Sequence, residues 1–267
     1  MIRRVALALI CAVMLFPLLL MITNSFSDSR QFLRMPPRIT PQRWTVENYA
    51  AILALPLLPR WLANTVLVAV LSIVGGVLVN GAAGYAFAVF KARWMTWLFW
   101  AMMAPIFVTG IMTIIARFVV VSRIGLRGLP AVVLMNLFWS TGIFLFRNYF
   151  REIPVGILES ARLDGAGEWT VLTHIVLPIS RPIVGCAVVF LGMGALGDYI
   201  WQMLNLQQAE QQTFVVGMIA AATDVYMVKN IGRELAIGTL LFLPVMLLFA
   251  VSSRYFIGGL TGGALKE

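Results

Sequence analysis

The chain has 267 residues, of which 61% are apolar and only 12% are charged, and its net charge is +9. Because a soluble domain carries about 25% charged residues, this composition excludes a disordered chain, a disulfide scaffold, a coiled coil and an ordinary soluble enzyme. The basic residues fall in short patches between apolar blocks, which favours phospholipid headgroups over nucleic acid as their partners.

The first apolar stretch covers residues 5–22, directly after Arg3 and Arg4. A signal peptide has the same order of charged and apolar residues, but this run is longer than a usual signal-peptide core and no small-residue cleavage site follows it. About 20 helical residues cross a hydrocarbon core of ~30 Å. We therefore expect an uncleaved transmembrane helix here.

Five further stretches are long enough to cross a bilayer and almost free of charge. They cover residues 62–90, 95–116, 128–146, 182–206 and 235–253. Backbone polar groups in lipid must be paired within their own segment, which requires helices, and the alternating short segments of a β-barrel are missing. The sequence thus predicts an all-α polytopic membrane protein with six transmembrane helices. Residues 44–58 and 213–223 are expected to form short segments at the outer face.

Residues 150–178, between the fourth and fifth stretches, form a charged loop with a helical pattern of its own. Pro154 suits a first helical turn, apolar residues follow at helical spacing, and Gly165 interrupts the helix before a second stripe begins at Trp169. The spacing predicts a short helix, a bend and a second helix along the membrane face. On composition alone, a solvated loop whose charges stay hydrated is the alternative interpretation.

This loop resembles the EAA loop of permease subunits of ATP-binding-cassette importers. Glu159-Ser160-Ala161 is followed by Gly165, Ile175 and Leu177-Pro178 at the spacing of that motif, with Ser160 where the family usually has alanine. Further segments resemble the carbohydrate-importer branch of the family, so that the likeness covers nearly the whole chain. They are residues 44–49, 64–65, 83–91, 153–165, 213–217 and 259–266.

The resemblance implies that the loop is a coupling helix that docks on a separate cytoplasmic ATPase. The residues expected to carry this contact are Glu159, Ser160, Ala161, Asp164, Gly165, Ile175, Leu177 and Pro178. The resemblance also orients the chain, which the positive-inside rule does not, because ten basic residues fall on each side. Both termini are then cytoplasmic, in the inner membrane of a bacterial or archaeal cell.

Three regions follow from this reading. Residues 1–61 hold an N-terminal transmembrane helix and an external loop, residues 62–257 the core permease, and residues 258–267 a cytoplasmic C-terminal tail. The partners implied by the resemblance are a second permease subunit, two ATPase subunits and an external solute-binding protein, besides membrane lipid; no nucleic acid is expected.

Asp198 is the only acidic residue deep in a predicted span. An ionisable group in hydrocarbon is costly and usually faces a cavity or a partner, so we expect Asp198 on a translocation path, together with Asn136, Ser140 and Gln202. A position near the outer face, or a hydrogen bond between helices, is the alternative for each of these polar residues.

No catalytic constellation is present in the sequence. The phosphate-binding pattern G-x-x-x-x-G-K-[ST] is absent, and no Cys or His cluster has metal-ligand spacing. We therefore expect no enzyme activity, cofactor or metal in this chain, and the resemblance assigns ATP and Mg²⁺ to the partner ATPase. The predicted function is import of a mono- or oligosaccharide by alternating access. A polyol or a glycerol phosphoester is the alternative solute, and an ion-coupled secondary carrier is disfavoured because only Asp198 could couple an ion.

Overall fold

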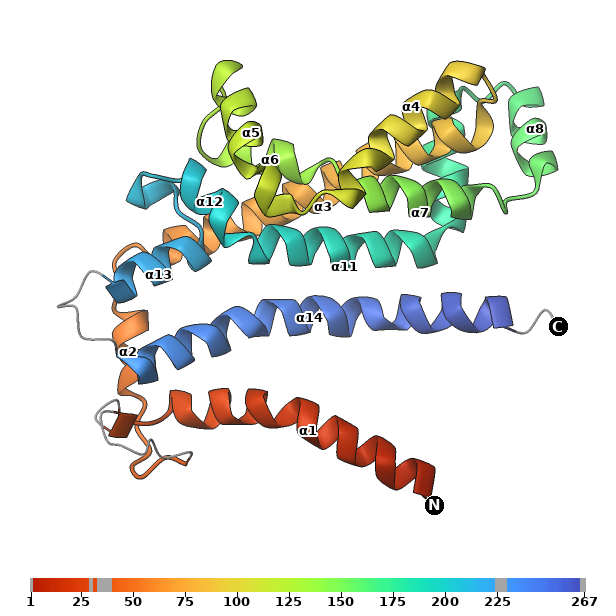
Figure 1. Ribbon diagram of the computed structural model, residues 1–267. Coiled ribbons are helices and arrows are strands. Elements are labelled where there is room, and N and C mark those ends of the chain that lie inside the picture. The colour runs from red at the N-terminus through yellow and green to blue at the C-terminus, as the bar shows by residue number, and fades with distance from the viewer. Residues whose placement is uncertain (1, 29–30, 33–39, 224–229, 265–267) are drawn as a thin grey trace.

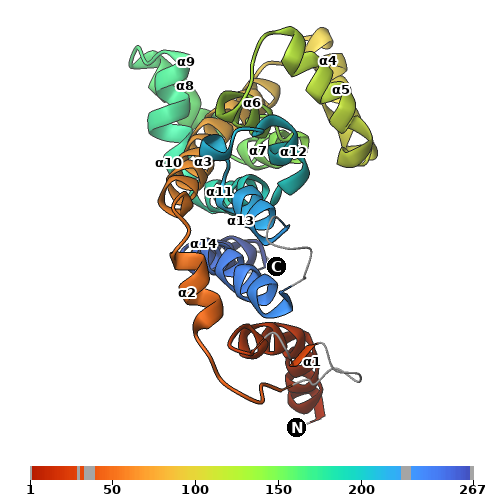
Figure 2. The same cartoon turned by 90° about the vertical axis from the view of Figure 1, so that its left-hand side faces the viewer.

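The computed structural model describes residues 2–28, 31–32, 40–223 and 230–264. This part of the chain consists of helices and the turns and loops between them, with one isolated β-bridge between Ser27 and Trp44. Five helices pack in a row, each against the next (Figures 1 and 2). In spatial order they are α1 (Ile2–Ser25), α14 (Ile231–Ala264), α11 (Arg181–Gly197), α3 (Leu58–Val89) and α7 (Ser140–Phe150). The expected C-terminal tail continues α14 through residue 264, and residues 265–267 lie outside the described residues, as do residues 29–30 and 33–39 of the expected external loop.

Small residues on α3 let its two neighbours in the row, α7 and α11, approach closely. A methyl group placed on Gly84 would lie 2.5 Å from Cβ of Phe146 in α7, and one on Gly76 would lie 2.8 Å from the side chain of Leu191 in α11. Contact of this kind supplies the packing between membrane helices, where the hydrophobic effect between them is weak. The glycines of α3 thus fix it against α7 and α11.

Three helices are long and apolar enough to cross a membrane, namely α1, α3 and α14, and three bent helix pairs raise the number to as many as six. The expected all-helical polytopic architecture is confirmed. Several of the spans are nevertheless broken where the sequence predicts a continuous helix.

The prediction of one continuous helix over residues 95–116 is wrong. Helix α4 (Arg93–Met103) passes into the short 3₁₀ helix η2 (Ala104–Phe107), and α5 (Gly110–Arg123) leaves at 117° to it. Pro105 has no N–H to donate to the carbonyl one turn earlier, which favours the change from α-helix to 3₁₀ helix. The chain then changes direction where the backbone is extended, at Val108 and Thr109.

The fourth predicted span is also broken, with α6 (Leu129–Asn136) meeting α7 at 40°. Asn80 of α3 is fully buried and supplies the hydrogen bonds that the break leaves open. Its Nδ2 donates to the Leu137 carbonyl at 2.8 Å, and its Oδ1 accepts from the Trp139 N–H at 3.0 Å. A buried backbone group must be paired, so Asn80 stabilises this bend.

The fifth predicted span ends early, at Gly197, and α12 (Tyr199–Asn205) follows as a separate short helix. Asp198 stands between them and accepts a hydrogen bond from the Trp201 N–H at 3.2 Å, so that it caps α12. An aspartate in this position satisfies a backbone donor that the first helical turn leaves unpaired.

The remaining short helices mark the two ends of the row (Figure 1). Helices α2 (Glu47–Leu53) and α13 (Phe214–Thr223), together with the 3₁₀ turn η4 (Ala209–Gln211), lie at one end, where the sequence predicts short external segments. Helix α8 (Val155–Leu163) lies at the opposite end, together with the N-terminal end of α1 and the C-terminal end of α14. The arrangement therefore puts both ends of the described chain on the same side as the candidate coupling loop.

Candidate functional site

The candidate coupling loop, residues 150–178, folds as a short helix, a bend and a second helical segment, which confirms the predicted pattern. Helix α8 ends at a left-handed Gly165 (φ +85°), whose N–H donates to the Arg162 carbonyl at 3.0 Å. The next N–H, of Ala166, donates to the Ala161 carbonyl at 3.0 Å. This pair of bonds is a Schellman motif, in which glycine is favoured because the backbone is left-handed. The chain continues through α9 (Glu168–Thr170), the π-helical turn η3 (Val171–Val176) and α10 (Leu177–Ile179).

The inner face of the loop belongs to the same apolar core as the membrane helices. Leu158 and Ala161 of α8 are buried, and so are the apolar residues of the second segment. They form one cluster with Tyr85 of α3, Phe146 of α7 and Ile183 of α11. The loop and these three helices therefore share one close-packed core, which has low compressibility.

A polar clamp holds the two segments of the loop to each other and to α3. The Arg162 guanidinium donates to the Glu168 carboxylate at 2.8 Å, and the Tyr85 hydroxyl donates to the same carboxylate at 2.6 Å. The hydrogen bond to Glu168 raises the pKa of Arg162 above its usual range. Sequence reasoning missed this clamp, since Tyr85 and Glu168 are 83 residues apart and no spacing rule connects them.

The outer face of the loop is exposed and partly apolar. The side chain of Leu163 is 88% exposed, that of Val155 is 63% exposed and that of Trp169 is 60% exposed. Glu159 and Asp164 are exposed on the same loop. We call Val155, Leu163 and Trp169 the apolar tip. Neither Val155 nor Leu163 was expected to serve a contact, and their only sequence signal is a large apolar residue off the buried stripe.

The eight residues expected to couple to an ATPase all lie on this loop but differ in exposure. Ala161 is buried, Ile175 and Leu177 are half-buried, and the other five are exposed. The Ser160 hydroxyl donates to the Gly156 carbonyl of its own helix at 2.7 Å. Their contact with an ATPase stays a prediction.

The four residues expected on a translocation path do not meet in one cavity. Asp198 is half-buried and lines a cavity of about 210 Å³ that Arg117 of α5 also lines. Asn136 donates to the Ser72 hydroxyl at 3.3 Å, and Ser140 begins α7 on the other side of the break. Gln202 is buried, donates to the Ala195 carbonyl at 2.7 Å and accepts from the Thr213 hydroxyl, so it packs helices in this conformation.

A protein-family model and a known relative each match most of this chain. The family model described as "Binding-protein-dependent transport system inner membrane component" matches residues 72–260. The chain is 28% identical to the trehalose/maltose transport system permease protein MalG of Thermococcus litoralis over 278 aligned residues, which cover 99% of this chain and 95% of the relative.

Two further similarities are informative. The chain is 25% identical to the sn-glycerol-3-phosphate transport system permease protein UgpE of Brucella suis biovar 1, over 92% of this chain and 90% of the relative. A solved chain of a bacterial ABC transporter involved in the import of the acidic polysaccharide alginate is similar in fold, with a TM-score of 0.78 at 20% identity over 96% of this chain and 95% of the solved one.

Proposed function

Because the chain belongs to the family of binding-protein-dependent transport system inner membrane components, we propose that it moves a carbohydrate across the inner membrane and receives the work of ATP hydrolysis through residues 150–178. Membership makes it a multi-pass inner-membrane permease of an ABC importer, without ATPase activity of its own. We propose, beyond this membership, which class of solute it moves, which residues couple it to the ATPase and which partners it has.

The observation that carries the coupling proposal is the division of the loop into a buried and an exposed face. Its inner face is continuous with the core of α3, α7 and α11, while the apolar tip is left uncovered by the described chain. Burying a leucine side chain stabilises a contact by about 1.5–3 kcal/mol. A groove on the ATPase that covers Leu163 would thus gain most of its apolar contact energy from the tip, with Glu159 and Asp164 meeting basic groups.

The proposed partners are those that the family pattern implies. Two cytoplasmic ATPase subunits bind ATP and Mg²⁺, a second permease subunit completes the path, and an external binding protein delivers the solute. In this arrangement the coupling loop and the ends of α1 and α14 are cytoplasmic, since they lie at one end of the row.

The coupling proposal is tested with Leu163→Asp in the importer reconstituted from this chain and its cognate ATPase. We expect at least about tenfold weaker binding of the ATPase, because the contact loses an apolar side chain and would bury a charge. Leu53→Asp is the matched control, since Leu53 is 72% exposed on α2 at the other end of the row. Normal ATPase binding and transport by Leu163→Asp would overturn the proposal.

A carbohydrate is preferred over a phosphoester because of the charges around Asp198. Asp198 and Arg117 line the same cavity, so its lining carries one charge of each sign and no net charge. Arg117 is also held by its own helix, through hydrogen bonds to the Thr113 hydroxyl at 3.0 Å and the Gly110 carbonyl at 3.3 Å. A lining with donors, acceptors and no net charge suits a hydroxyl-rich neutral solute better than a phosphate.

The solute proposal is tested by uptake into proteoliposomes that hold the complete importer. Asp198→Asn is expected to reduce uptake of the sugar and leave basal ATP hydrolysis unchanged. Glycerol phosphate uptake that exceeds sugar uptake, and that Arg117→Gln abolishes, would assign the phosphoester instead. Unchanged sugar uptake by Asp198→Asn would remove this cavity from the path.

A further inference from the structure

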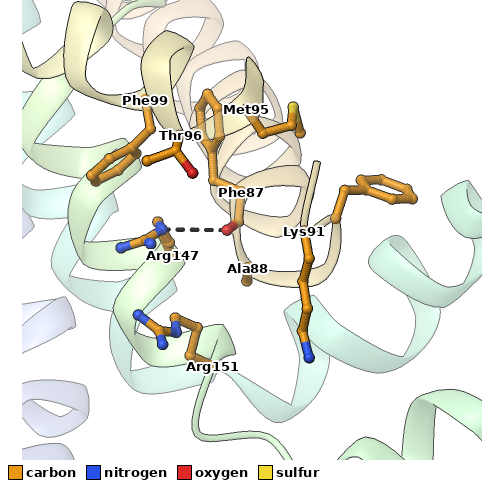
Figure 3. Close-up of a pocket in the computed structure, with 9 residues that line it drawn as sticks. Phe87, Ala88, Lys91, Met95, Thr96, Phe99, Arg147 and Arg151 are labelled. Atoms are coloured by element: carbon orange, nitrogen blue, oxygen red, sulfur yellow. Dashed lines mark hydrogen bonds between the residues drawn. The ribbon is translucent and has the colours of Figure 1, made fainter. Parts of the chain in front are cut away.

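A pocket of about 270 Å³ lies beside the turn that joins α3 to α4, at the same end of the row as α8. Three basic side chains line it: Lys91 from the turn, Arg147 from the last turn of α7, and Arg151 directly after that helix (Figure 3). The rest of its lining is mostly apolar and aromatic and includes no carboxylate. In the described part of the chain, no carboxylate lies within 4.0 Å of any of the three cations.

Repulsion among these three cations destabilises the protein unless an anion binds between them. Arg147 and Arg151 are four residues apart at the C-terminal end of α7, where like charges destabilise each other. The Arg147 guanidinium is nevertheless fixed: its Nε donates to the Phe87 carbonyl at 3.3 Å, and its central carbon lies 4.2 Å from the centre of the Phe99 ring. Such a guanidinium is pre-organised for a phosphate, which it can bind through two parallel hydrogen bonds.

The depth of the pocket in the membrane is indicated by the outer face of α4. Trp94, Trp97 and Trp100 are 64%, 80% and 62% exposed, while Met95 and Phe99 on the other face are buried against α3 and α7. Exposed tryptophans gather at the level of lipid headgroups. Helix α4 therefore places the pocket at that level, with Phe90 exposed beside it.

We propose that this pocket binds the headgroup phosphate of an anionic phospholipid. Basic pockets between membrane helices at the cytoplasmic surface recognise such headgroups. Its volume lies just under the ~300–1,000 Å³ of pockets that enclose a whole small ligand, which suits a headgroup whose acyl chains stay outside, against the exposed aromatic residues. The pocket adjoins the start of the coupling loop, since Arg151 lines it, but no residue of 152–178 does.

The test uses the full chain in nanodiscs that contain equal parts of phosphatidylglycerol and phosphatidylcholine, with retained lipid counted by native mass spectrometry. We expect the wild type to retain phosphatidylglycerol in preference to phosphatidylcholine. Lys91→Gln/Arg151→Gln should retain at least about tenfold less of it, as expected when charged hydrogen bonds are removed. This variant leaves the packed Arg147 in place, and monodisperse gel filtration checks that it folds.

Arg123→Gln is the matched control, because Arg123 is an exposed arginine in the last turn of α5 that does not line the pocket. It should retain phosphatidylglycerol as the wild type does. Equal retention of the two lipids by the wild type, an equal loss in the control, or no loss in the double variant would each overturn the proposal.

Two further experiments distinguish a bound lipid from a soluble anion and from a protein partner. Inorganic phosphate is titrated against lipid-loaded protein, and displacement of phosphatidylglycerol at millimolar phosphate would assign a soluble anion instead of a lipid. If the double variant keeps its lipid but loses the ATPase in the reconstituted importer, the pocket is a protein contact and the lipid site is excluded. These readouts do not depend on the solute or on Leu163, so failure here leaves the proposed function standing.

Discussion

Replacing Tyr85 by phenylalanine removes a single hydroxyl at the junction between α3 and the coupling loop. The ring is buried and packs edge-on against Phe150, so Tyr85→Phe keeps the apolar contacts. It loses the 2.6 Å hydrogen bond to Glu168 and a longer one, 3.4 Å, that the hydroxyl accepts from Arg162. A hydrogen bond to a charged group contributes about 1.5–3 kcal/mol. Glu168 is 45% exposed, which brings the expected value to about 1–2 kcal/mol because solvent screens the charge.

This value exceeds what the other half of the clamp supplies. The Arg162–Glu168 pair has two hydrogen bonds, of 2.8 and 3.2 Å, but its side chains are 35% and 45% exposed. Ion pairs that solvent reaches contribute about 0.2–1 kcal/mol. We therefore expect Tyr85→Phe to loosen the loop from α3. A loss of about 1–2 kcal/mol lowers the ratio of loops packed on α3 to loops detached from it five- to thirtyfold. Solute-stimulated ATP hydrolysis by the reconstituted importer should fall, while binding of the ATPase to the apolar tip is kept.

A double-mutant cycle with Glu168→Gln measures the interaction directly. If Tyr85→Phe and Glu168→Gln reduce stimulated hydrolysis by amounts that add within about 0.3–0.5 kcal/mol, the two residues are not coupled and the reasoning is refuted. Tyr149→Phe is the matched control, because the Tyr149 hydroxyl on α7 makes no hydrogen bond to a described residue and its loss should change neither readout.

Three other substitutions test the packing. Asn80→Leu should lower the free energy of unfolding in detergent by about 2–4 kcal/mol, because it leaves two half-buried backbone groups of the α6–α7 break unpaired. A loss below about 1 kcal/mol, typical of a helix–helix hydrogen bond in a membrane, would contradict this. Gly84→Ala should cost about 1–3 kcal/mol and lower the melting temperature, since the new methyl meets α7 at 2.5 Å, whereas Gly194→Ala, with nothing within 4 Å, should leave it unchanged. Gly165→Ala should strain the bend by about 1 kcal/mol, because residue 165 has a φ of +85°, and should reduce stimulated hydrolysis. Gly167→Ala should do neither, because Gly167 has a φ of −70° and equally open surroundings. Equal effects of the two substitutions would mean that the left-handed turn does not matter.

The apolar stretches and the bend of the coupling loop could be predicted because they depend on local signals. Length without charge indicates a membrane helix, and Gly165 placed after an amphipathic turn indicates the end of a helix. Pro105 is a local signal near the break between α4 and α5, but the uniform apolar character of residues 95–116 favours one continuous helix.

The contacts that organise the site depend on residues far apart in the chain. Asn80 reaches the backbone of residues 137 and 139, and Tyr85 reaches Glu168, so neither role can be read from spacing. The same holds for the expected path. The sequence shows Gln202 as a polar residue within a predicted span. Its hydrogen-bond partner Thr213 lies beyond the end of α12, so only the fold shows that the two side chains interact.

The position of α1 has a consequence for how the protein is made. Its neighbour in the row is α14, which begins about 200 residues later in the chain, and its apolar window is uncovered by the rest of the molecule. At a synthesis rate of about 5–20 residues per second, α1 spends roughly 10–40 s in the bilayer before that neighbour emerges from the ribosome. Its apolar surface lets α1 remain in the bilayer as an independent anchor until α14 is made and docks against it.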